Sequence, residues 1–290
     1  MKSQLQLQVH RLDGQPDTVV TIAPGTTCGG KSLFIAGGPC AVEDQEQMTS
    51  VGAALRSAGV CALRGGVYKP RSSPYSFQGL GEEGLAVLRR TRLESGLPVV
   101  TEVMSALQIE EAASSCDVFQ VGSRNMQNFE LLKVLAGAGK PVLLKRGLSA
   151  TVEELLLAAE YLLAGGNRDV ILCERGIRSF DTATRNVLDL GAVVLLKQLT
   201  HLPVIVDPSH AAGKRELVAS LSRAAIAAGA DGLIIECHPR PEQSVSDARQ
   251  ALSLGEMRRL MSSLVPVAAA VGREVGSINE SKRLILHPSA

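Results

Sequence analysis

The sequence contains no tryptophan, and aromatic residues make up only 3% of its 290 residues. Single-stranded nucleic acids are bound largely by stacking bases on aromatic rings, so this composition argues against such a surface. Basic residues number 30 and acidic residues 29, and the net charge of +1 offers no basic excess for a phosphate backbone. We therefore expect no nucleic-acid partner.

Long apolar runs and paired cysteines are also missing. No apolar run is long enough to cross a bilayer, and the N-terminus (MKSQLQLQVHRLDG) lacks the continuous apolar segment of a signal peptide. The six cysteines are scattered without a CxxC pair, and several lie in or beside apolar runs, which indicates buried thiols in a reducing compartment. The sequence predicts a cytoplasmic protein with no membrane partner.

Short apolar runs recur along most of the chain, and several are wholly apolar over four residues, as in parallel strands buried on both faces. They are residues 33–36, 60–63, 98–103, 117–121, 141–145, 170–173, 203–206 and 232–235. Amphipathic segments separate them and predict helices over residues 44–58, 82–95, 105–115, 127–138, 150–164, 184–199, 214–228 and 247–263. Eight strands that are each followed by a helix are the pattern of a (β/α)8 barrel.

The expected fold class is thus α/β, with a single (β/α)8 TIM barrel over residues 31–265. Residues 1–30 are polar and broken by Gly and Pro, and we expect a short N-terminal extension in which a strand at 19–22 forms a hairpin that closes the barrel bottom. Residues 266–290 form a C-terminal tail. The Gly37-Gly-Pro-Cys40 turn does not match the dinucleotide-binding fingerprint of an open doubly wound sheet.

Polar residues follow every predicted strand, and in this fold the carboxyl ends of the strands build the active site. One group is cationic and predicts a polyanionic ligand that carries phosphates and a carboxylate. It comprises Arg64, Lys69, Arg71, Arg124, Lys145 and Arg175. Its densest part is the loop after the second strand, where a Gly pair and Pro70 hold three cations and the hydroxyl of Ser72 close together.

A second group has the donor atoms of a metal site: Cys40, His210, Glu236 and Asp247. A thiolate, an imidazole and two carboxylates suit a divalent transition ion such as Mn²⁺, Fe²⁺, Co²⁺ or Zn²⁺. Cys40 alone is better explained as a buried thiol, and His210 alone as a loop histidine. Because a barrel closes its eighth strand against its first, the ends of strands one, seven and eight converge, and we interpret the set as a metal site.

The sequence resembles the 3-deoxy-D-arabino-heptulosonate 7-phosphate (DAHP) synthases of the type I beta subtype, from about residue 33 to 263. The likeness rests on specific motifs: Gly38-Pro-Cys40, the stretch from Arg64 to Gly84, Val121-Gly-Ser-Arg-Asn-Met-Gln-Asn128, Leu144-Lys-Arg-Gly147, Glu174-Arg-Gly-Ile-Arg178, Asp207-Pro-Ser-His210, Ile235-Glu-Cys-His238 and Ser246-Asp247. The resemblance implies a transferase of the shikimate pathway that condenses phosphoenolpyruvate with erythrose 4-phosphate.

The resemblance also implies roles for single residues. Cys40, His210, Glu236 and Asp247 are the implied metal ligands, and Arg64, Lys69, Arg124, Lys145 and Arg175 the implied phosphoenolpyruvate site. Arg71 and Ser72 are expected to bind the phosphate of erythrose 4-phosphate, and Asp207 to belong to the substrate site. In catalysis, beside Cys40 and His210, we expect Lys69 to protonate the new hydroxyl and Glu102 to position the water.

The chain departs from the family pattern at Ser72, where Thr is usual, and at Gly37 and Ser123, where Ala is usual. We expect neither a regulatory domain nor feedback inhibition, and a homodimer or homotetramer. The alternatives left open are a 3-deoxy-D-manno-octulosonate 8-phosphate synthase that uses arabinose 5-phosphate, against which the Lys-Pro-Arg-Ser stretch argues, and a non-catalytic paralogue. A Schiff-base aldolase that uses Lys145 leaves the metal-ligand set unexplained.

Overall fold

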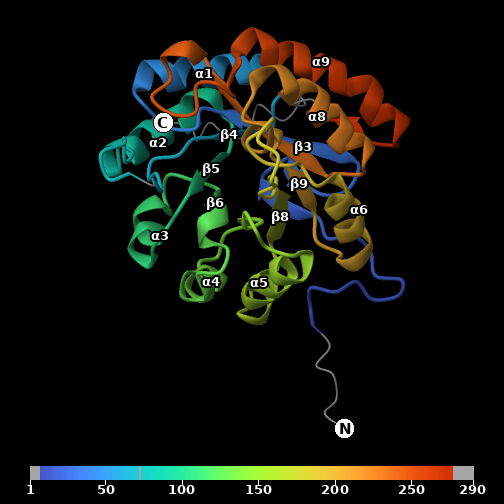
Figure 1. The fold of residues 1–290 in the computed structure, drawn as a ribbon. Helices are drawn as coiled ribbons and strands as arrows, with labels where there is room; N and C mark the ends of the chain where they lie inside the picture. The colour runs from blue at the N-terminus through green and yellow to red at the C-terminus, as the bar shows by residue number, and fades with distance from the viewer. Residues whose placement is uncertain (1–6, 72, 277–290) are drawn as a thin grey trace.

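The computed structural model describes residues 7–71 and 73–276, and a closed barrel of parallel strands is its centre (Figure 1). In this part of the chain eight strands pair in sequence order, and the last pairs with the first to close the barrel. They are β3 (Ser32–Gly38), β4 (Ala62–Arg64), β5 (Val99–Glu102), β6 (Val118–Val121), β7 (Val142–Lys145), β8 (Val170–Glu174), β9 (Val204–Val206) and β10 (Gly232–His238). The predicted (β/α)8 fold is confirmed.

Helices cover the outside of the barrel between successive strands (Figure 1). They are α1 (Gln45–Ser57), α2 (Glu82–Ser95), α3 (Ala106–Ala112), α4 (Phe129–Ala136), α5 (Val152–Ala164), α6 (Leu190–Leu199), α7 (Pro208–Ala212), α8 (Arg215–Ala227) and α9 (Leu254–Ala270). Short 3-10 turns, η1 (Ser123–Asn125) and η2 (Pro241–Gln243), follow β6 and β10. Two further short strands pair in parallel with barrel strands: β11 (Leu252–Ser253) with β10, and β12 (Glu274–Val275) with β3.

Two predicted helices begin later than expected, and each has a capping residue that explains the difference. The helix predicted over 184–199 begins at Leu190, because the Asp189 carboxylate accepts a hydrogen bond from the amide of Ala192 at 2.8 Å and caps α6. The helix predicted over 247–263 is α9, which begins after Ser253, where Ser253 and Glu256 form a capping box. It continues through residue 265 to Ala270, so the expected division between barrel and tail falls inside a helix.

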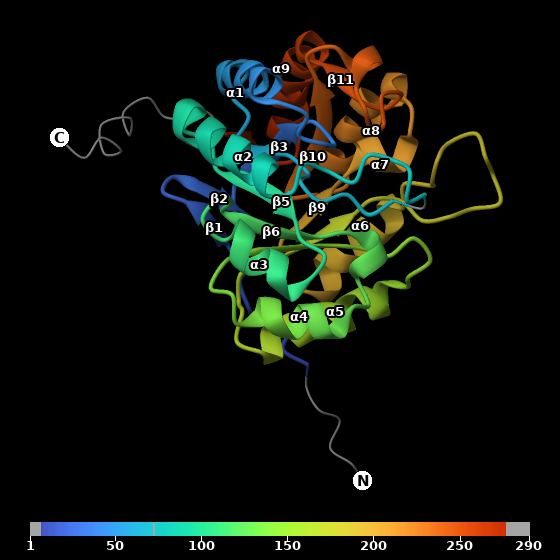
Figure 2. The same ribbon diagram turned by 90° about the vertical axis from the view of Figure 1, so that its left-hand side faces the viewer.

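The end of the barrel at which the strands begin is closed by the β-hairpin of β1 (Val20–Ala23) and β2 (Thr26–Cys28). Figure 2 shows this hairpin on the left, at the opposite end from the long loops on the right. Val20, Ile22 and Cys28 of the hairpin pack in the same buried cluster as Phe34 and the other inward-facing strand residues. The expected hairpin at the barrel bottom is therefore present. The opposite end, where the strands terminate, is not covered by this hairpin and can hold a functional site.

Candidate active site

Six of the eight barrel strands place a polar side chain two residues beyond an inward-facing apolar one. Successive side chains of a strand point to opposite faces, so residues two apart share a face. Ala62 lies in the barrel interior, and Arg64 follows it on the same face of β4. The same step leads from Val100 to Glu102, Val118 to Gln120, Leu143 to Lys145, Ile205 to Asp207 and Ile234 to Glu236. All six polar residues are buried, and five of them are ionisable, so a mostly charged layer lies above an apolar one in the barrel.

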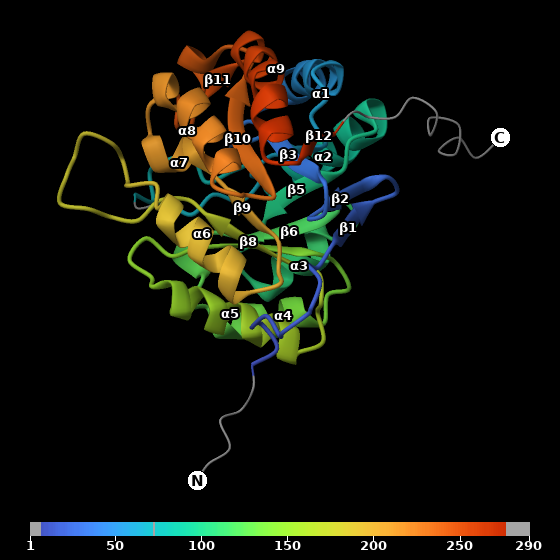
Figure 3. The same cartoon turned by 90° about the vertical axis from the view of Figure 1, so that its right-hand side faces the viewer.

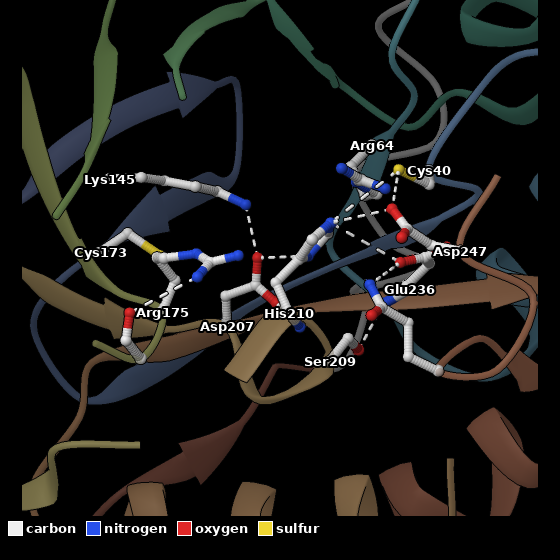
Figure 4. A network of polar contacts seen from close by, with 12 residues as sticks. Cys40, Arg64, Lys145, Cys173, Arg175, Asp207, Ser209, His210, Glu236 and Asp247 are labelled. Carbon is white, nitrogen blue, oxygen red and sulfur yellow. Dashed lines mark hydrogen bonds and ion pairs between the residues drawn. The ribbon is translucent and has the colours of Figure 1, made fainter. Parts of the chain in front are cut away.

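The thiol, imidazole and two carboxylates proposed as metal ligands meet in this layer (Figure 4). One donor atom from each of Cys40, His210, Glu236 and Asp247 lies within 4.8 Å of the others. Cys40 follows β3, Glu236 lies in β10, and Asp247 lies in the loop before β11, where it has a positive φ of 57°. His210 lies in α7, a helix that the sequence reasoning missed, although Asp-Pro at its start is a common helix-starting pair.

Direct contacts join the four side chains. The Cys40 thiol donates to Asp247 Oδ2 at 3.2 Å and lies 3.9 Å from His210 Nε2. His210 Nε2 is 3.8 Å from both Glu236 Oε2 and Asp247 Oδ2. The four donor atoms therefore surround a common point.

The electrostatics of this cluster fit a divalent cation. Burial raises the pKa of Glu236 to about 8, and its buried Oε1 has no hydrogen-bond partner among the described residues. Burial also acts to raise the pKa of the Cys40 thiol, but Lys69, His210 and Arg64 together hold it below its usual value. A bound cation would provide a partner for the free carboxylate oxygen of Glu236 and would favour the ionised form of the Cys40 thiol.

Beside the cluster, Asp207 joins a lysine to one of the proposed ligands. Its Oδ2 lies 2.5 Å from Lys145 Nζ and 2.8 Å from His210 Nδ1, and all three are drawn in Figure 4. Lys145 and Asp207 are buried. Burial acts to raise the pKa of Asp207, but His210 and Lys145 keep it well below the usual range. Asp207 is therefore an anion that fixes both the lysine and the imidazole.

Arg64 and Lys69 are held against the loop that carries Cys40. Arg64 Nη1 donates to the carbonyl of Pro39 at 2.8 Å, and Lys69 Nζ lies 2.9 Å from both the carbonyl and the sulfur of Cys40. A Cβ at Gly66 would lie 2.7 Å from the Cys40 carbonyl oxygen and 3.1 Å from Lys69 Nζ. The glycine pair after β4 therefore allows the backbone to lie close to Cys40 and Lys69, as its position at a strand end predicts.

The other site residues predicted from the sequence range from buried to exposed. Arg71 donates to Ser246 Oγ at 2.7 Å, beside Asp247, whereas Ser72 lies outside the described residues. Glu102 is buried and accepts from Gln120 Nε2 at 3.2 Å. Arg175 is buried at the end of β8, where desolvation lowers the pKa of its guanidinium. Arg124 lies exposed in η1.

Two residues near the metal-ligand set were missed by the sequence reasoning. Gln250 Nε2 donates to Glu236 Oε2 at 2.7 Å, and Arg185 Nη1 lies 3.0 Å from Asp247 Oδ1. Gln250 is three residues beyond Asp247, which is the one signal that could have pointed to it. Arg185 lies eleven residues beyond Glu174, the end of the nearest preceding strand, so its sequence position does not indicate a place in the site.

Comparison with known proteins places this geometry in a family. The sequence profile of the DAHP synthetase I family matches residues 17–271. The chain belongs to the DAHP synthetase I family. Within it, the chain is 48% identical over 259 residues to a phospho-2-dehydro-3-deoxyheptonate aldolase of Thermotoga maritima, a match that covers 89% of this chain and 76% of that protein. It is 35% identical over 249 residues to a 2-dehydro-3-deoxyphosphooctonate aldolase of Acidithiobacillus ferrooxidans, covering 79% and 87%.

Solved structures of this family have the same fold. The crystal structure of the Thermotoga maritima DAHP synthase aligns with a TM-score of 0.89 at 45% identity, covering 94% of this chain and 79% of that one. A truncated form of the same organism's enzyme aligns with a TM-score of 0.86 at 43% identity, covering 92% and 98%. Among the described residues, no helix of this family member is both long and apolar enough to span a membrane.

Proposed function

We propose that this member of the DAHP synthetase I family is a metal-dependent DAHP synthase. It condenses phosphoenolpyruvate with D-erythrose 4-phosphate and water, giving 3-deoxy-D-arabino-heptulosonate 7-phosphate and phosphate, in the cytoplasm as a homodimer or homotetramer. The observation that carries the proposal is a cluster of four metal-donor side chains, two of them buried and two partly buried, that adjoins a set of cations. The higher identity to the heptonate aldolase than to the octonate aldolase supports the choice of sugar.

In this proposal Cys40, His210, Glu236 and Asp247 hold a divalent ion such as Mn²⁺, Fe²⁺, Co²⁺ or Zn²⁺. When bound, such an ion supplies Lewis-acid polarisation of the aldehyde oxygen of the sugar phosphate. Asp207 keeps the His210 ring in place through its 2.8 Å contact with Nδ1, so that Nε2 faces the cluster.

The cations divide between two anionic substrates that repel one another. Arg64, Lys69, Arg124, Lys145 and Arg175 hold phosphoenolpyruvate, with Asp207 fixing Lys145 in the substrate site. Arg71 and Ser72 hold the phosphate of erythrose 4-phosphate, and the contact of Arg71 with Ser246 brings that site beside Asp247. Bringing two anions together in one geometry is chiefly proximity and electrostatic catalysis.

The reaction forms one carbon–carbon bond and breaks the bond between C2 of phosphoenolpyruvate and the phosphate oxygen. The methylene carbon of phosphoenolpyruvate forms a carbon–carbon bond to the aldehyde carbon, and Lys69 gives a proton to the new alkoxide. The electron pair of the carbon–carbon double bond forms the new bond, so C2 of the former phosphoenolpyruvate becomes cationic. Water positioned by the buried Glu102 carboxylate adds at C2 and returns one proton to Lys69. Cleavage of the bond between C2 and the phosphate oxygen leaves the ketone, and the departing phosphate takes the remaining proton of the C2 hydroxyl.

The test is phosphate release from phosphoenolpyruvate with added Mn²⁺, with erythrose 4-phosphate and arabinose 5-phosphate compared as partners. We expect turnover with erythrose 4-phosphate and a much lower kcat/KM with arabinose 5-phosphate. The opposite preference identifies an octulosonate phosphate synthase, and no phosphate release with either sugar identifies a non-catalytic paralogue.

A further inference from the structure

The long loop between β8 and α6, residues 175–189, projects from the end of the barrel where the site lies (Figures 2 and 3). Its two arms are joined by a pair of backbone hydrogen bonds of 2.9 Å between Ile177 and Val187. It starts at Arg175, one of the proposed substrate cations, and ends at Asp189, the cap of α6. Residues 175–189, called the finger below, thus form a hairpin-like loop whose first residue belongs to the proposed substrate site.

The returning arm of this finger contacts the residues of the metal-ligand set. Arg185 Nη1 donates to Asp247 Oδ1 and to Gln250 Oε1, each at 3.0 Å. Gln250 in turn donates to Glu236 Oε2 at 2.7 Å. Asn186 Nδ2 donates to the carbonyl oxygen of His210 at 3.0 Å. One short segment therefore reaches three of the four proposed ligands.

The backbone fixes the arm in this position. The amides of Arg185 and Asn186 donate to the carbonyls of Ala212 and Ala211 at 3.0 and 2.9 Å. Gly213 has a φ of +65°, and a Cβ there would lie 2.5 Å from the Cβ of Arg185. Gly176 has a φ of +88°, and its Cβ would lie 2.8 Å from that of Asn186. The two glycines permit a close approach that any larger residue would prevent.

Asp247 needs such support more than the other ligands do. Among the described residues it is the one non-glycine residue with a positive φ, and it lies in a loop between η2 and β11. Neither a strand nor a helix therefore fixes its carboxylate. We propose that Arg185 is a positioning residue of the metal site, which orients the Asp247 carboxylate directly and the Glu236 carboxylate through Gln250. This inference rests on the proposed function, because it takes Asp247 and Glu236 as ligands.

The guanidinium geometry matters as well as the charge. The same Nη1 atom serves a carboxylate oxygen and an amide oxygen, while Arg185 remains 38% exposed at its side chain. A lysine supplies one mobile ammonium and keeps the charge without the planar arrangement of donors. Removing an outer partner of a metal ligand typically lowers metal affinity or activity by about 10–100-fold.

The test is a Co²⁺ titration of metal-free protein, followed by the thiolate-to-Co²⁺ absorption band and by the heat of binding. We expect Arg185→Met to weaken Co²⁺ binding by about 10–100-fold, with Arg185→Lys between it and the unchanged chain. Phe180→Ala is the matched control, because Phe180 is fully exposed at the tip of the same finger and should leave the affinity unchanged. Gln250→Leu cuts the link to Glu236, leaves the contact between Arg185 and Asp247 in place, and should also weaken binding.

A kinetic readout separates positioning from substrate contact. Because Arg185→Met lowers metal occupancy, raising the Co²⁺ concentration should restore most of kcat, with KM for both substrates within about threefold of the unchanged chain. Melting of the metal-free variants checks that they are folded. Unchanged Co²⁺ affinity in Arg185→Met overturns the inference, as does a rise in KM at unchanged affinity. If the unchanged chain itself gives no Co²⁺ band, or Cys40→Ser keeps the band, the proposed metal site fails instead.

Discussion

The two halves of the barrel interior are built from the same strands and have opposite character. In the lower half, Phe34, Val100, Leu143 and Ile171 are fully buried or nearly so, and the hairpin β1–β2 closes this end. Two residues beyond Val100 and Leu143 lie the charged side chains of Glu102 and Lys145, which are also buried. Apolar burial stabilises the fold, whereas buried ion pairs often stabilise it no better than apolar residues of similar volume. The difference indicates that the lower half serves stability and the upper half serves ligands.

The largest expected effect comes from removing a proposed metal ligand in the upper half. Cys40→Ala should lose nearly all metal-dependent turnover, because the thiolate can no longer bind the ion, while the lower half keeps the barrel folded. Phosphate release with and without added Mn²⁺, together with circular dichroism, measures both. Turnover by this variant in the presence of a chelator contradicts the metal assignment.

The second prediction compares Lys145 with Leu143, which lie two residues apart on the same face of β7. Lys145→Met leaves the buried Asp207 without its lysine partner and should lower the free energy of unfolding by about 3–5 kcal/mol. It should also weaken phosphoenolpyruvate binding, because a cation is lost. Urea denaturation and KM give the two values.

The matched change on the same strand is Leu143→Ala, which creates a cavity in the lower half. It should cost about 2–5 kcal/mol and leave KM unchanged. A raised KM for Leu143→Ala, or an unchanged one for Lys145→Met, means that the two halves are not functionally distinct.

A third change tests how tightly the upper half is fitted around Glu102. A Cβ at Gly122 would lie 2.1 Å from Glu102 Oε1, so Gly122→Ala must displace this carboxylate. A displacement of about 1 Å can cost about 100-fold in rate, and we expect a loss of kcat of that order. Steady-state kinetics measure it. Gly137→Ala is the control, because a Cβ there would lie 3.8 Å from its nearest neighbour, the carbonyl oxygen of Val134, and the φ of Gly137 is negative. Equal effects of the two substitutions on kcat would contradict the interpretation.

The smallest effect belongs to a conservative change in the lower half. Ile171→Val removes one buried methylene and should lower the free energy of unfolding by about 0.5–1.5 kcal/mol. Metal affinity and kcat/KM should stay the same, as measured by Co²⁺ titration and initial rates. A clear drop in either one shows that packing in the lower half controls the upper one.

Much of this comparison was accessible from the sequence, because strands and their ends follow local rules. Each predicted apolar run coincides with or overlaps a barrel strand, and the polar residue after it, such as Arg64 or Lys145, lies at the predicted end. Cys40 and Asp247 were predicted to meet, and their donor atoms do lie together.

The rest depends on contacts between segments far apart in sequence. Arg146 and Glu174 also lie at the ends of predicted strands, yet they form a buried pair 2.8 Å apart in which Arg146 also contacts Asp189. The placement of Arg185 on Asp247 depends on how the finger folds back onto α7, which no local pattern encodes. Helix starts were misplaced where a single cap decides the boundary, as Asp189 does for α6.

The most direct test of the division between the two halves is an anomalous difference map of crystals grown with Mn²⁺ and phosphoenolpyruvate. We expect one strong peak within bonding distance of Cys40 Sγ, His210 Nε2 and the carboxylates of Glu236 and Asp247, with phosphoenolpyruvate density beside Lys145. A peak elsewhere, or a cluster with no metal at saturating Mn²⁺, contradicts the account.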